Sequence, residues 1–93
     1  MIKTFANKET AAVFARQTVR DFGADWLPIA QRKLAQLHQA QTLDDLRVPP
    51  GNRLEKLTRD RVGQYSIRIN DQWRMCFEWR DGHAWAVEIT DYH

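Results

Sequence analysis

The chain has 93 residues, of which 43% are hydrophobic and 28% charged. These fractions exclude a disordered or fibrous chain, and together with the length they predict a single domain over residues 1–93. The sequence lacks an apolar run of the roughly 20 residues that span a bilayer, and it begins without the apolar segment of a signal peptide. We therefore expect a cytoplasmic protein that does not bind a membrane.

Cysteine and histidine usage argues against redox or metal chemistry. The single cysteine, Cys76, allows neither an internal disulfide nor a CxxC motif. The three histidines, His38, His83 and His93, lack the spacing that places two metal ligands on one helix or strand. The sequence predicts no metal site and no cofactor.

Positive charge is concentrated in one part of the chain, although the net charge is only +2. Residues 47–80 contain eight arginines and lysines against four acids, and seven of these eight cations are arginine. Arginine pairs with phosphate through its planar guanidinium, so this composition favours a nucleic-acid ligand. The alternative is an ordinary solvated surface.

The first forty residues show helical signals. Asn7 is suited to cap a helix that Gly23 would end, with Ala11, Ala15 and Thr18 along one face. Asp25 would cap a second helix that tolerates Pro28 in its first turn. The apolar residues of this second helix recur at helical spacing and predict one buried stripe of Leu27, Ala30, Leu34 and Leu37.

A short turn capped by Thr42 should follow, and the segment 49–51 (Pro-Pro-Gly) should stop regular structure. After it, apolar residues alternate with polar ones over 65–69 and 73–79, which predicts two strands joined at 70–72. In this hairpin Ile67 pairs with Met75, and Arg68 faces Arg74 directly.

A third strand over 85–89 follows Asp81-Gly82. A two-residue loop there would place Glu78 opposite Trp85 and mix charge into the apolar face. A three-residue loop or a one-residue bulge instead pairs Trp79 with Trp85 and Met75 with Ile89, which collects the apolar residues on one face. We adopt this second register, with Trp85 in the core.

These elements predict an α+β fold, in which two N-terminal helices pack on one face of a small antiparallel β-sheet. The opposite face is polar and carries Arg68 and Arg74. Like charges facing each other across two strands repel, so their coexistence favours an anionic ligand unless both side chains extend into water.

Three stretches carry a resemblance to a known family: PPGNRLEKL at 49–57, GQYSIRINDQWRMCF at 63–77 and EITDYH at 88–93. Together they resemble the HigB-type toxins of bacterial toxin-antitoxin modules, a branch of the RelE/ParE superfamily. The resemblance covers nearly the whole chain. It implies a RelE-like fold and a ribosome-dependent, metal-independent endoribonuclease that cuts mRNA during translation.

The resemblance also implies site residues. Arg74, Asp91, Tyr92 and His93 match catalytic positions of the family, and Arg74 is suited to contact the phosphate from a rigid strand. Glu55 and Thr58 stand where better known relatives have histidine and lysine, which leaves the general base open. The remaining cations of this region would bind ribosomal RNA and the mRNA backbone: Lys56, Arg59, Arg61 and Arg68.

The implied partners are the ribosome, mRNA and a cognate HigA-like antitoxin with a helix-turn-helix. Operator DNA would be bound only through that antitoxin. Two other functions fit parts of the pattern. A ParE-like inhibitor of DNA gyrase would need neither Arg74 nor the terminal Asp-Tyr-His, and a generic RNA-binding domain would explain the arginines but not this terminal motif.

Overall fold

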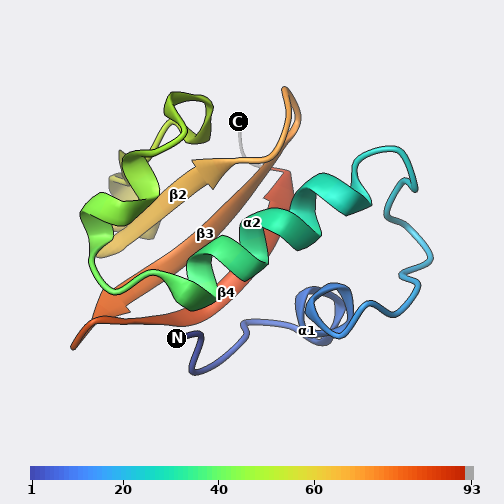
Figure 1. The fold of residues 1–93 in the computed structure, drawn as a ribbon, viewed down its shortest axis with the longest axis horizontal. Helices are drawn as coiled ribbons and strands as arrows, with labels where there is room; N and C mark the ends of the chain where they lie inside the picture. Colours follow the sequence, from blue (N-terminus) through green and yellow to red (C-terminus); the bar gives the residue numbers. More distant parts are fainter. Residues whose placement is uncertain (92–93) are drawn as a thin grey trace.

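Two α-helices lie on one face of a four-stranded antiparallel sheet in the computed structural model, which describes residues 1–91 (Figure 1). The strand order is β1-β2-β3-β4. The elements are α1 (Lys8–Phe14), α2 (Leu27–Gln39), β1 (Glu55–Lys56), β2 (Gln64–Arg68), β3 (Trp73–Arg80) and β4 (His83–Asp91), with 3-10 helices η1 (Leu43–Arg47), η2 (Pro50–Asn52) and η3 (Arg59–Arg61). The expected α+β fold is confirmed. Within residues 1–91, no helix is long and apolar enough to cross a membrane.

The core lies between α2 and the sheet. Ala30, Leu34 and Leu37 are fully buried, as the helical spacing predicts. They belong to one hydrophobic cluster with the sheet residues Met75 and Phe77, which are also fully buried. Because α2 covers this face, the face on the other side of the sheet is left for polar side chains.

The first helix is shorter than the sequence predicts. Asn7 caps it by accepting a hydrogen bond from Thr10 N at 2.9 Å, but the helix ends at Phe14 rather than near Gly23. Arg16 adopts the left-handed region (φ 61°). The amides of residues 16 and 17 bond back to the carbonyls of residues 13 and 12, a pattern that terminates helices. The buried positions are Thr10 and Val13, and the expected face with Ala15 and Thr18 is exposed.

The start of α2 also differs from the prediction. Trp26, not Asp25, is the N-cap, and its side chain makes no capping hydrogen bond. The Gly23 carbonyl accepts from the amides of Trp26 and Leu27 instead. The Trp26 ring stacks on Trp73 of β3, with 5.0 Å between ring centroids, so tertiary packing sets where this helix begins.

The predicted turn after α2 is confirmed in η1. Thr42 accepts a hydrogen bond from Asp45 N, and the Asp45 carboxylate accepts from the amides of Gln41 and Thr42. Hydrogen bonds from these two backbone amides, Gln41 first, lower the pKa of the Asp45 carboxyl.

The first hairpin has the expected register, since Ile67 pairs with Met75 and Arg68 with Arg74. The second hairpin, formed by β3 and β4, has both a two-residue loop and a bulge, which the sequence analysis gives as alternatives. Its loop has two residues, because Asp81 and Gly82 both have positive φ, and Arg80 pairs with His83 across it.

A bulge further along this hairpin changes the register. Ala86 adopts a positive φ of 52°, and β4 gains one residue relative to β3 between Cys76 and Glu78. Beyond the bulge Met75 pairs with Ile89, as predicted.

The two-residue loop overturns the prediction that Trp85 lies in the core opposite Trp79, because Trp85 lies between the loop and the bulge. Trp79 pairs with Ala84, and Trp85 pairs with Glu78 on the polar face. There the Trp85 ring lies 4.5 Å from the Arg80 guanidinium carbon, measured to the ring centroid. The two-residue loop sets the pairing of the residues next to it, and the bulge restores the apolar register beyond Trp85.

The N-terminal segment covers the outer edge of β4. Lys3 N and Ala6 N donate to the carbonyls of Ala84 and Val87 at 2.8 and 2.9 Å. Two threonine hydroxyls accept amides from the same strand: Thr10 from Ile89 N at 2.9 Å and Thr4 from Ala86 N at 2.8 Å. Thr10 is fully buried, whereas Thr4 is exposed.

These two threonines provide a matched test. Thr10→Val should lower the free energy of unfolding by about 1–3 kcal/mol, because the Ile89 amide loses its acceptor in a buried place. Thr4→Val should lower the free energy of unfolding by only a few tenths as much, because water can replace the exposed hydroxyl as acceptor for the Ala86 amide. Urea unfolding of both variants measures the difference, and equal losses would contradict this account.

Candidate active site on the polar face of the sheet

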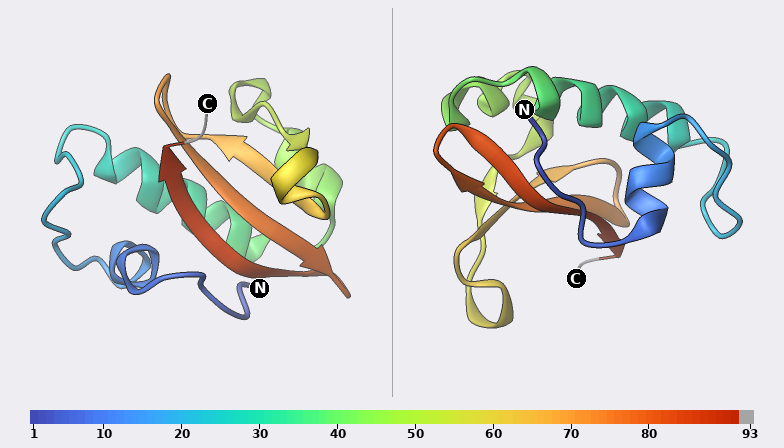
Figure 2. Two further views of the ribbon diagram at one scale, coloured as in Figure 1. Left: turned by 180° about the vertical axis from the view of Figure 1, so that it is seen from behind. Right: turned by 90° about the horizontal axis from the view of Figure 1, so that it is seen from below.

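The face of the sheet that points away from α2 carries aligned rows of polar side chains. One row contains Glu55, Ser66, Cys76 and Glu88, and the next contains Arg68, Arg74 and Thr90. Figure 2 shows the segment of η3, in yellow, on this side of the sheet and α2 on the other. The predicted juxtaposition of Arg74 with Arg68 is confirmed, and Thr90 pairs with Arg74 on the other side.

Arg74 is held by three groups. Its Nε donates to Ser66 Oγ at 2.8 Å, and its Nη2 donates to the Arg53 carbonyl at 2.8 Å. The Glu55 carboxylate lies 3.9 Å from the same Nη2. Only 14% of the Arg74 side chain is exposed, so the expectation of a rigidly placed arginine is met.

One guanidinium nitrogen of Arg74 remains available. Nη1 donates to no acceptor within residues 1–91, whereas Nε and Nη2 are engaged by protein atoms. A guanidinium fixed in this way can offer its outer N–H groups to a phosphate without the cost of immobilising a long side chain.

Glu55 is a functional candidate that the sequence reasoning did not select. In the sequence, Glu55 stands out only as a departure from the family, at a position where relatives have histidine. The structure brings its carboxylate to the Arg74 guanidinium, with 55% of the Glu55 side chain exposed. Glu55 is brought to Arg74 because it pairs with Ser66 across β1 and β2. The sequence does not predict this pairing, because a strand of two residues is too short to show alternation of apolar and polar residues.

The other arginines on this face also have acidic partners. Arg61 pairs with Glu88 at 3.0 Å, and Arg68 pairs with Asp71. Arg68 is half-buried, whereas Asp71 is fully exposed, so that pair is held only weakly. The predicted RNA-binding residues Lys56 and Arg59 are exposed on β1 and η3.

The C-terminal residues are placed only in part. Asp91 pairs with Trp73 in the sheet and accepts a hydrogen bond from Gln72 Nε2 at 3.1 Å. Because side chains alternate along a strand, Asp91 shares the face of Trp73 rather than that of Arg74. Tyr92 and His93, the other two residues of the predicted catalytic tail, lie outside the described residues.

Cys76 lies in the middle of this face but is unsuited to nucleophilic attack. It is fully buried, and burial raises the pKa of its thiol, outweighing the opposite effect of Arg61 and Arg74. The thiol therefore stays protonated at neutral pH. No group of three histidine, cysteine, aspartate or glutamate residues within residues 1–91 is arranged to hold a metal ion.

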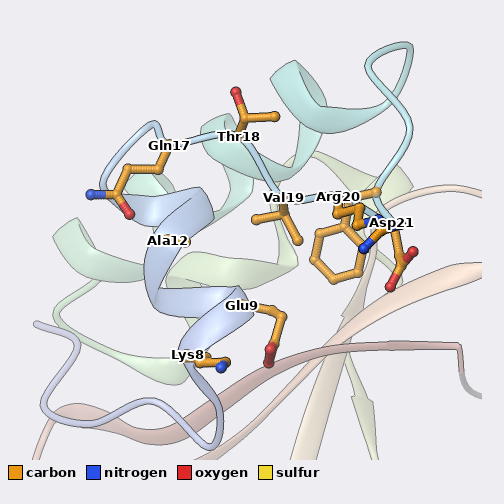
Figure 3. A pocket seen from close by; sticks show the side chains of 9 residues that line it. Lys8, Glu9, Ala12, Gln17, Thr18, Val19, Arg20 and Asp21 are labelled. Carbon is orange, nitrogen blue, oxygen red and sulfur yellow. The ribbon is translucent and has the colours of Figure 1, made fainter.

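A hollow on another part of the molecule has balanced charge. It has a volume of about 450 Å³ and lies between α1 and the segment that follows it (Figure 3). Lys8 and Arg20 line it together with Glu9 and Asp21. Two cations against two acids give no preference for an anion, so the polar face of the sheet remains the better candidate site.

Comparison with known proteins agrees with this architecture. Residues 3–93 match the family of HigB-like toxins, described as RelE-like toxins of the type II toxin-antitoxin system HigB. The chain belongs to this family. The resemblance found in the three sequence stretches is thereby confirmed.

Two relatives carry HigB names. Toxin HigB-1 of Vibrio cholerae is 53% identical over 53 residues, which cover 57% of this chain and 56% of that protein. The match thus spans about half of that relative. Endoribonuclease HigB of Proteus vulgaris is 28% identical over 97 residues, covering all of both chains.

A solved structure shows the same fold. A chain of the YoeB-YefM complex from Staphylococcus aureus superposes with a TM-score of 0.62 at 18% identity, covering 100% of this chain and 98% of that one. At this identity the likeness concerns the fold, and it confirms the expected RelE-like architecture.

The contacts of Arg74 predict a structural cost when it is replaced. Arg74→Lys keeps the charge, but an ammonium cannot bond both Ser66 and the Arg53 carbonyl in the same geometry. We expect the free energy of unfolding to fall by about 1–2 kcal/mol in urea titrations. Arg80→Lys, at an arginine whose side chain is 59% exposed, is the control and should change stability little. Equal effects would show that the Arg74 contacts do not stabilise the fold.

Proposed function

We propose that this chain is the toxin of a type II toxin-antitoxin system and acts as an endoribonuclease that cleaves mRNA on the ribosome. Membership of the HigB-like family supports the toxin assignment. The name of the Proteus vulgaris relative supports RNA cleavage. The observation that carries the proposal is the fixed Arg74 guanidinium beside the Glu55 carboxylate on an arginine-rich face.

The reaction would use the RNA's own 2′-hydroxyl. The 2′-oxygen forms a bond to the adjacent phosphorus, the bond from phosphorus to the 5′-oxygen breaks, and the products are a 2′,3′-cyclic phosphate and a 5′-hydroxyl. Such a step needs a base for the 2′ proton, a cation for the phosphorane and an acid for the leaving 5′-oxygen. This chain offers candidates for all three roles.

Arg74 would contact the scissile phosphate through Nη1. Its charge stabilises the additional negative charge that develops as the phosphorane forms, and its fixed position avoids reorganisation during the reaction. The bonds to Ser66 and the Arg53 carbonyl act by holding the guanidinium in place.

Glu55 would take the 2′ proton. A carboxylate is a competent base, and this one is exposed to an incoming substrate while close to the cation that would hold the phosphate. This role would fill the place of the general base, because the glutamate can accept a proton at the position where relatives have histidine.

The C-terminal residues would complete the site. Tyr92 and His93 are the candidates to protonate the 5′-oxygen and to orient the ribose, while Asp91 would position the end of β4 through Gln72. Lys56, Arg59, Arg61 and Arg68 would bind the backbone of mRNA and ribosomal RNA, with a strong dependence on salt.

The expected partners are an antitoxin, the ribosome and mRNA. The family description, a toxin of a toxin-antitoxin system, supports an antitoxin in general terms. We propose a HigA-like antitoxin with a helix-turn-helix, through which the complex would bind operator DNA.

The test is mapping of 5′ ends on a translated mRNA in a reconstituted translation system, with and without ribosomes. Glu55→Gln should lower the rate of cleavage about 100-fold or more, because the amide cannot accept the 2′ proton. Arg74→Lys should lower it by a similar factor through misplacement of the charge.

Glu78→Gln, which also removes an acid from the polar face, is the control and should cleave at the normal rate. Thermal melting separates loss of activity from loss of fold, especially for Arg74→Lys. Normal cleavage by folded Glu55→Gln would remove that residue from the mechanism. Absence of cleavage by the unaltered chain would refute the endoribonuclease itself.

The tail has a separate test. Tyr92→Phe and His93→Gln should each slow mRNA cleavage by about 100-fold while the melting temperature stays within a degree or two, since Val87 and Ile89 anchor β4 in the core. Co-sedimentation with ribosomes should be retained. Unchanged cleavage in both variants would exclude the tail from proton transfer.

A further inference from the structure

A second concave site lies on the side of α2 that faces η2. This pocket has a volume of about 450 Å³. Arg32 and Lys33 of α2 line one wall, Gly51 of η2 another, and Arg68 at the end of β2 a third. Among residues 1–91, no carboxylate lines it. Three cations in a concavity without an acid produce a local positive potential that attracts an anion.

The position of Lys33 is fixed by a buried polar contact. Its Nζ donates to Oδ1 of Asn52, which is fully buried. The Asn52 amide in turn donates to the Leu46 carbonyl and to Gln36 Oε1, each at 3.0 Å. The ammonium is therefore held at the pocket by a network that needs no rearrangement when a ligand arrives.

The three cations of the pocket repel one another. Burial lowers the pKa of Lys33, and the charges of Arg32 and Arg68 lower it further. An anion between these three groups would relieve that repulsion. Arg32 forms no ion pair within residues 1–91, and the partner of Arg68, Asp71, is fully exposed and readily replaced.

We propose that Arg32, Lys33 and Arg68 form a binding site for a phosphate of single-stranded RNA, separate from the phosphate that Arg74 contacts. This inference rests on the proposed function and adds a subsite to it. Arg68 links the two places, because it pairs with Arg74 across the strands and also lines the pocket. An RNA strand that reaches Arg74 would thus be gripped at a second phosphate beyond the edge of β2.

The architecture favours RNA over a protein carboxylate. Two of the three cations are guanidiniums, which bind phosphate oxygens in pairs, and one of them, Arg68, also pairs with Arg74 across β2 and β3. An RNA strand also carries a phosphate at every nucleotide, so one strand can place one phosphate in the pocket and another at Arg74.

Gly51 allows a sharp experiment. A Cβ added there would meet nothing within 4 Å, so larger side chains fit without disturbing the fold. Gly51→Glu puts a carboxylate at the pocket, and Gly51→Gln puts in a neutral side chain of the same size. The probe is a single-stranded hexanucleotide with every 2′-hydroxyl methylated, titrated into the full chain and followed by amide NMR shifts at low salt.

For the unaltered chain we expect amide shifts at Arg32, Lys33, Gly51 and Asn52. Gly51→Glu should weaken binding about tenfold or more, while Gly51→Gln should stay within about twofold. Arg32→Gln should weaken binding several-fold and reduce the slope of log K against log salt by about 0.7, the value for one lost single-strand phosphate contact. Arg20→Gln, an exposed arginine elsewhere, is the control for net charge.

Equal affinity of Gly51→Glu and Gly51→Gln for the RNA would overturn the proposal. So would shifts at the pocket with an acidic peptide but none with RNA, since the site would then serve a carboxylate. Shifts with inorganic phosphate alone, and no gain in affinity with the hexanucleotide, would show a free-anion site and also overturn it.

The probe cannot be cleaved, because it lacks a free 2′-hydroxyl. Binding at the pocket is therefore measured independently of the reaction. A chain that binds the probe there but never cleaves mRNA would refute the proposed function and leave the subsite intact. A chain that cleaves normally with Gly51→Glu and binds the probe unchanged would refute only the subsite.

Discussion

The hydrogen bond from Arg74 to the Arg53 carbonyl ties the sheet to the segment that precedes β1. Arg53 adopts the left-handed region (φ 46°) at the end of η2, which turns the chain toward β1. The Arg74 side chain is fixed rather than mobile, because its Nε also donates a hydrogen bond to Ser66 on the adjacent strand. The short strand β1, and with it Glu55, depends on this anchor, since only two of its residues pair with β2. The same contacts that stabilise the edge of the sheet therefore also create the candidate site.

Charge on the polar face is arranged as pairs rather than as an unbalanced patch. Arg61, Arg68, Arg74 and Arg80 each have a carboxylate within 4 Å. Exposed pairs of this kind are weak, so a phosphate can replace Asp71 at Arg68 at little cost. The partly buried pair of Arg61 and Glu88 is less easily exchanged, and it braces η3 against the sheet. Recognition of RNA would thus depend on which arginines can release their partners, in addition to how many there are.

The two edges of the sheet are protected differently. The N-terminal segment covers the outer edge of β4 through backbone bonds and the hydroxyls of Thr4 and Thr10. The other edge ends in β1, which is too short to template a further strand. The site lies near this second edge, where Glu55 is exposed and a ligand has access.

Local patterns in the sequence determined the identity of most elements. Alternation of apolar residues placed Ile67 opposite Met75 and Arg68 opposite Arg74, and Asn7 and Thr42 marked the starts of a helix and a turn, because strand alternation and capping involve only near neighbours. The motifs in the stretches 49–57, 63–77 and 88–93 were together enough to indicate the family. Tertiary structure alone decided the start of α2 at Trp26, the bulge at Ala86 that follows Trp85 in β4, and the contact between Glu55 and Arg74. Each of these depends on packing or hydrogen bonding between residues far apart in the chain, and no periodicity within a segment encodes such contacts.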